Sequence, residues 1–108
     1  TDEAIRQYQT ELELDPENYH VHVALAELLE QQGKQDDARQ HLQTALQLNP
    51  QLYRAHTALG LLLERRGDYR QAIQHFSAAL RLEPGDSTAE ENLRQLQAER
   101  DRTGKRSS

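Results

Sequence analysis

The sequence repeats itself with a period of 34 residues. When residues 19–52 are placed over residues 53–86, 15 of the 34 aligned positions are identical. Pro16, Pro50 and Pro84 keep the same spacing. A fixed period of this length is typical of stacked units, each too small to bury its apolar face alone. We therefore expect an array of small units packed side by side.

Each unit is predicted to be a pair of helices. The first half of each unit carries apolar residues at helical spacing: Val21, Leu25, Leu28 and Leu29, then Ala55, Leu59, Leu62 and Leu63. Gly33 and Gly67 follow, and each can end a helix in the left-handed conformation. The second half has its own apolar stripe: Ala38, Leu42, Ala45 and Leu46, then Ala72, Ile73, Phe76, Ala79 and Leu80. The prolines prevent these second helices from continuing.

The flanks match incomplete units. The apolar stripe near the N-terminus resembles a second helix without its first, and the last apolar stripe has the polar substitutions of a helix that closes an array. The expected organisation is a truncated preceding repeat over 1–18, repeats over 19–52 and 53–86, a capping helix over 87–101 and a flexible tail over 102–108. Because the first residue is Thr1 rather than Met, we expect the chain to be part of a larger protein.

This pattern resembles the tetratricopeptide repeat family. The matching positions are Leu25, Ala26, Leu29, Ala38, Leu42, Ala45 and Pro50, and again Leu59, Gly60, Leu63, Ala72, Phe76, Ala79 and Pro84. His22 and His56 depart from it, since the family usually has tryptophan there. The resemblance implies an all-α solenoid of about six helices, in antiparallel pairs that form a right-handed superhelix.

Composition excludes several classes of function. The chain has no cysteine, which removes disulfides, thiolate zinc sites and cysteine catalysis. A net charge of −5 argues against nucleic acid as a partner. No apolar run approaches the roughly 20 residues that span a bilayer. The sequence lacks a nucleophile motif and a glycine-rich phosphate loop, so we expect neither an enzyme nor a cofactor.

The histidines are copied with the repeat. His56 lies 34 residues after His22, and His75 lies 34 after His41. A zinc site needs at least three converging ligands, and no third ligand is evident, so we expect no metal. His22 and His56 are predicted to fill half-buried positions between helices, and His41 and His75 to lie on the outer helix surface.

The family resemblance implies a concave groove, lined by the first helices of successive units, that holds a peptide of a partner protein. Helix phase then predicts the lining residues as His20, Val23, Glu27, Arg54, Thr57, Leu61, Glu64, Thr88, Glu91 and Gln95. Some family members bind the C-terminal carboxylate of heat-shock chaperones through a lysine and an asparagine in the first helix. Here Val23 and Glu27 stand at those positions, and Glu27 would repel a carboxylate, so we expect a different specificity.

Self-association is the alternative function. The N-terminal helix would leave apolar surface uncovered where its missing partner belongs, and such surface commonly binds another chain. The residues expected to mediate a weak homo-oligomer are Ile5, Tyr8 and Leu12.

Gly60 interrupts a predicted helix, where glycine costs about 1 kcal/mol relative to alanine. The first unit has Ala26 at the same position. We therefore expect that alanine would be tolerated at position 60 and that a larger side chain would not.

Overall fold

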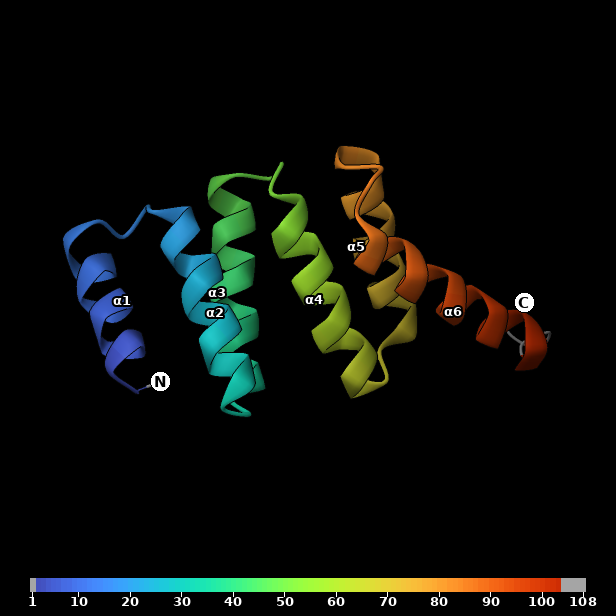
Figure 1. Ribbon diagram of the computed structural model, residues 1–108, viewed down its shortest axis with the longest axis horizontal. Coiled ribbons are helices and arrows are strands. Elements are labelled where there is room, and N and C mark those ends of the chain that lie inside the picture. The colour runs from blue at the N-terminus through green and yellow to red at the C-terminus, as the bar shows by residue number, and fades with distance from the viewer. Residues whose placement is uncertain (1, 104–108) are drawn as a thin grey trace.

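The computed structural model describes residues 2–103, which form six helices and no strand (Figure 1). The helices are α1 (Asp2–Leu14), α2 (Tyr19–Gln31), α3 (Gln35–Leu48), α4 (Tyr53–Arg66), α5 (Tyr69–Leu82) and α6 (Ser87–Thr103). They stand side by side in chain order, and this described part extends 49 × 26 × 21 Å. The expected all-α solenoid is confirmed.

The helices pack as the repeat predicts. Helices α2 and α3 form one antiparallel pair, and α4 and α5 form the next (Figure 1). Helix α1 packs on α2, and α6 packs on α5, so each end of the described stack has a single helix. Helix α6 continues two residues past the expected boundary at 101. Residues 104–108 of the expected tail lie outside the described residues.

Glycine ends the first helix of each repeat. Gly33 and Gly67 have φ angles of 81° and 86°, a left-handed conformation that costs other residues steric strain. The residue after each glycine donates its N–H to a carbonyl five residues back: Lys34 to Leu29 and Asp68 to Leu63, both at 2.9 Å. The backbone therefore turns sharply enough for the next helix to return along the first.

One repeat position controls how the first helices begin. Residues 18, 52 and 86 are equivalent under the period. The side chain of Asn18 accepts the N–H of Val21, and that of Asp86 accepts the N–H of Ala89. Leu52 has no polar side chain and makes no such bond. Helix α4 therefore lacks the side-chain cap that its counterparts have, which is worth about 1 kcal/mol in helix stability.

Small residues allow the paired helices to approach closely. Ala38, Ala45, Ala72 and Ala79 are the alanines of the two second helices at equivalent positions, and none exposes any surface. The largest fully buried side chain is Phe76 of α5. Interiors packed at crystal-like density leave no room for added atoms at such contacts.

Gly60 provides space for Phe76. A Cβ atom at position 60 would lie 2.6 Å from the Phe76 ring. The expectation that alanine would be tolerated is therefore wrong. The first repeat has Ala26 at this position but Leu42 in place of Phe76. The larger residue of one helix is therefore matched by a smaller residue of the other in each repeat.

We predict that Gly60→Ala lowers the free energy of unfolding by about 1–2 kcal/mol. Overpacking costs about 1–3 kcal/mol, and the gain in helix propensity offsets at most about 1 kcal/mol. The double variant Gly60→Ala, Phe76→Leu copies the first repeat and should recover most of the loss. Urea unfolding of both variants, with Phe76→Leu as the matched single change, measures the coupling. A stabilising Gly60→Ala would contradict this packing account.

Candidate functional site

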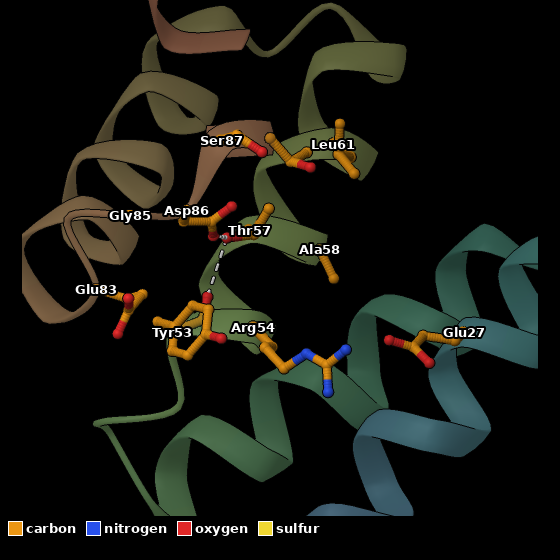
Figure 2. A pocket seen from close by; sticks show the side chains of 11 residues that line it. Glu27, Tyr53, Arg54, Thr57, Ala58, Leu61, Glu83, Gly85, Asp86 and Ser87 are labelled. Carbon is orange, nitrogen blue, oxygen red and sulfur yellow. Dashed lines mark hydrogen bonds between the residues drawn. The ribbon is translucent and has the colours of Figure 1, made fainter. Parts of the chain in front are cut away.

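The first helices of successive repeats enclose a depression of about 450 Å³. It is lined from α2 by Glu27, from α4 by Tyr53, Arg54, Thr57, Ala58 and Leu61, and from α6 and the loop before it by Glu83, Gly85, Asp86, Ser87 and Thr88. Figure 2 shows these side chains around the open space between the helices. A concave site at the junction of several elements is where proteins usually bind ligands.

The structure brings five of the ten expected groove residues together here: Glu27, Arg54, Thr57, Leu61 and Thr88. Under the repeat period, Arg54 and Thr88 are equivalent to each other, as are Glu27 and Leu61. The depression includes Glu27 from the second half of α2 and Thr88 from the first turn of α6. It therefore crosses the parallel first helices diagonally.

The diagonal leaves the other five expected residues outside this depression. His20 is exposed, with its ring centroid 4.7 Å from that of Tyr19. Val23 packs against the core instead. Glu91 and Gln95 are exposed on α6. Glu64 is partly buried, which raises the pKa of its carboxyl group.

A polar contact joins α4 to the start of α6 in the lining of the depression. The Thr57 hydroxyl lies 2.5 Å from one carboxylate oxygen of Asp86, to which it donates, and 3.1 Å from the carbonyl oxygen of Tyr53 (Figure 2). The other carboxylate oxygen of Asp86 caps α6 through Ala89. One side chain thus starts α6 and joins it to α4, and hydrogen bonds to a charged group are the stronger kind.

Acidic side chains outnumber basic ones around the depression. Glu27, Glu83 and Asp86 line it, against the single cation of Arg54. Figure 2 shows the guanidinium of Arg54 extending across the opening towards Glu27. The potential at the opening should therefore be negative, and it should attract cations from solution.

A smaller hollow of about 160 Å³ adjoins the depression and shares Glu27, Ala58 and Leu61 with it. Its remaining lining is Ala26, Glu30, Leu42 and Leu62, so it is mainly apolar. The carboxylate of Glu30 pairs with Arg65 of α4. The two hollows together give a polar, acidic part beside an apolar part, which suits a segment carrying both a charge and an apolar anchor.

Helix phase missed the loop residues of the site. Glu83, Gly85 and Asp86 lie between α5 and α6, and phase arguments place only residues within helices. One signal in the sequence could have found Asp86: it occupies the repeat position at which Asn18 starts α2. An acidic residue there predicts a cap at the edge of the groove.

The histidines form two pairs inside the repeats. His22 meets His41, and His56 meets His75, with facing ring nitrogens at 3.0 and 3.1 Å. The expectation that His41 and His75 lie on the outer surface is therefore wrong: both are partly buried against the first helix. Burial lowers the pKa of His41 and of His75. Within residues 2–103, no three histidine or acidic side chains gather as a metal site.

The residues expected to mediate self-association are largely covered. Ile5 is only 7% exposed and belongs to the core, and Tyr8 and Leu12 pack partly against it. Leu14 is the open apolar side chain of α1, at 83% exposure. Self-association through Ile5, Tyr8 and Leu12 stays a prediction.

Comparisons with known proteins agree with this architecture. In the described residues, no helix is both long and apolar enough to cross a membrane. No curated protein matches the sequence. Among solved structures, the chain is similar to the first tetratricopeptide repeat domain of Spaghetti (RPAP3) bound to the HSP90 peptide SRMEEVD. The TM-score is 0.86 and the identity 25%, over 90% of this chain and 77% of that one.

The sequence model described as tetratricopeptide repeat matches three overlapping segments, residues 1–53, 32–87 and 57–102. These segments together cover almost the whole chain. The chain belongs to the tetratricopeptide repeat family.

Proposed function

We propose that this chain is a protein-interaction module that binds a peptide segment of a partner in the depression across α2, α4 and α6. The observation that supports this most directly is the depression itself, a polar site of about 450 Å³ continuous with an apolar hollow. The similar domain of Spaghetti (RPAP3) was solved with a bound HSP90 peptide. That likeness supports a peptide as the ligand class and leaves the sequence of the peptide to be argued from this chain.

The preferred segment is neutral or basic and carries an apolar anchor. An acidic tail such as SRMEEVD would place its carboxylates near Glu27, Glu83 and Asp86, with Arg54 as the one cation of the lining. Like charges at such distances repel. A lysine or arginine would instead be attracted to the acidic edge, and an apolar side chain would fit the hollow beside Ala58 and Leu61.

Binding is a better explanation of the site than catalysis. The Thr57 hydroxyl beside the Asp86 carboxylate resembles a nucleophile with its base, but Thr57 is only 8% exposed. Asp86 is already engaged as the cap of α6. A reacting carbonyl needs access to the nucleophile, and the Thr57 hydroxyl is both covered and already bonded to Asp86.

We predict that charge decides which peptide binds. A matched pair consists of SRMEEVD and SRMKKVK, the latter amidated at its C-terminus. Fluorescence anisotropy at physiological salt should show micromolar binding of the basic peptide, as a short groove allows, and much weaker binding of the acidic one. Tighter binding of SRMEEVD would contradict the assigned charge of the groove. Binding of neither peptide would count against the depression as the site.

Removing the acidic groups of the depression should weaken the binding of the basic peptide. Glu27→Gln and Glu83→Gln each delete one exposed charge, and an exposed charge pair is worth about 0.2–1 kcal/mol, so each variant should lose up to about fivefold in affinity. Glu13→Gln on α1 is the matched control, because Glu13 is exposed and lies outside the depression. Equal losses in all three variants would show that net charge, rather than the groove, governs binding.

A further inference from the structure

Two histidine pairs join the first helix of each repeat to the second. The Nδ1 atoms of His22 and His41 are 3.0 Å apart, and those of His56 and His75 are 3.1 Å apart. The ring centroids are 5.2 and 5.3 Å apart, and both pairs have an interplanar angle of 34°. The same geometry is therefore built twice, at positions 34 residues apart, without a role in the groove.

Hydrogen bonding assigns the protons of each pair. The Nε2 atom of His22 lies 2.9 Å from the carbonyl oxygen of Pro16, and that of His56 lies 3.4 Å from Pro50. A carbonyl only accepts, so Nε2 carries the hydrogen and Nδ1 of the same neutral ring is a bare acceptor. His41 and His75 must then donate from Nδ1. One proton lies between the two facing nitrogens of each pair.

The pair can take up one further proton without breaking. That proton adds to Nε2 of His41 or His75, and their Nδ1–H still donates across the contact. A second added proton would have to occupy Nδ1 of His22 or His56. Two N–H groups would then face each other at about 3 Å on two charged rings, a repulsive arrangement.

We propose that each histidine pair is an acid-sensitive latch between the two helices of its repeat. It is closed while a single proton lies between the facing nitrogens, and it opens when both rings are charged. In the first pair His41 is the ring that leaves, because it is partly exposed while His22 is buried and held by Pro16. Acid therefore loosens α3 from α2, and likewise α5 from α4.

The pKa directions agree with this geometry. Burial and then the neighbouring ring lower the pKa of His41 and of His75. The unfolded chain has histidine pKa values near 6.5, so it binds more protons than the folded chain in mild acid. The stability from the pairs is complete above about pH 6.5 and is lost as the pH falls through the lowered folded values.

Charged neighbours make the two latches unequal. Asp37, on α3, partly offsets the lowering of the His41 pKa. The pKa of His56 is lowered by burial, raised in part by the Pro50 carbonyl, and lowered further by Arg81 on α5. At the equivalent positions stand uncharged Gln71 and Gln47. The first pair should thus accept protons at a higher pH than the second.

Unfolding measured at pH 7.5, 6 and 5, with chelator present, tests the latch. If each folded pair binds one proton fewer than the same two histidines in the unfolded chain, the unfolding constant rises about tenfold per pH unit for each pair. For both pairs the rise between pH 6 and 5 is about 100-fold. In the variant His41→Gln, His75→Gln, the glutamine amide can donate to the neutral inner ring and turn its oxygen towards the charged one. The inner ring can then bind its proton in the folded chain, and most of this rise should be lost. His20→Gln is the matched control, since His20 is exposed and belongs to neither pair, and should behave like the parent chain. An acid rise that persists unchanged in the double variant would overturn the proposal.

Nitrogen-15 NMR of the parent chain provides a second test that needs no variant. At pH 7.5, His22 and His56 should be protonated at Nε2, and His41 and His75 at Nδ1. On acidification, contacts between α2 and α3 should disappear as the second ring of the pair becomes charged. Both rings fully charged with those contacts intact would overturn the latch.

Discussion

The close approach of the two helices within each repeat is the constraint on which the other features depend. Fully buried alanines stand where the helices meet, and Gly60 leaves room for the ring of Phe76. This approach brings the ring nitrogens of one helix within hydrogen-bonding distance of those on the next. It also stacks the repeats so that α2, α4 and α6 enclose the depression.

The two sets of polar groups serve different parts of the molecule. Glu27, Arg54 and Glu83 line the depression, where we propose that their charges select the peptide. The histidine pairs lie within the repeats, between the two helices of each. Asp86 belongs to the first set and also has a structural role, because it starts α6, bonds to Thr57 of α4 and lines the depression.

Much of the fold could be predicted because short sequence signals specify each helix, and the same signals occur in both repeats. The period, the apolar stripes and the glycines at 33 and 67 each indicate the same helix pairs, and the φ angles of both glycines confirm their role. Whether position 60 tolerates alanine could not be predicted from that position alone. It depends on Phe76, 16 residues away, and the relevant comparison is the exchange of Ala26 with Leu42 for Gly60 with Phe76.

The site was harder to predict for a geometrical reason. Helix phase says which residues share a face of one helix, but the depression crosses three helices diagonally, so early residues of α2 and late residues of α6 fall outside it. The loop residues before α6 obey no helical period at all. His41 was misplaced for a related reason: its position on α3 is polar in character, and only the partner ring of His22 makes it an interior position.

The most direct test of the central functional claim is NMR mapping of the surface that the amidated peptide SRMKKVK contacts. With the chain labelled in nitrogen-15, the amide signals that shift on titration should belong to Glu27, Arg54, Leu61, Asp86 and their neighbours in α2, α4 and the start of α6. Signals of α3 and of the outer face of α5 should stay in place. Shifts concentrated on α1, or on α3 and α5, would contradict the account.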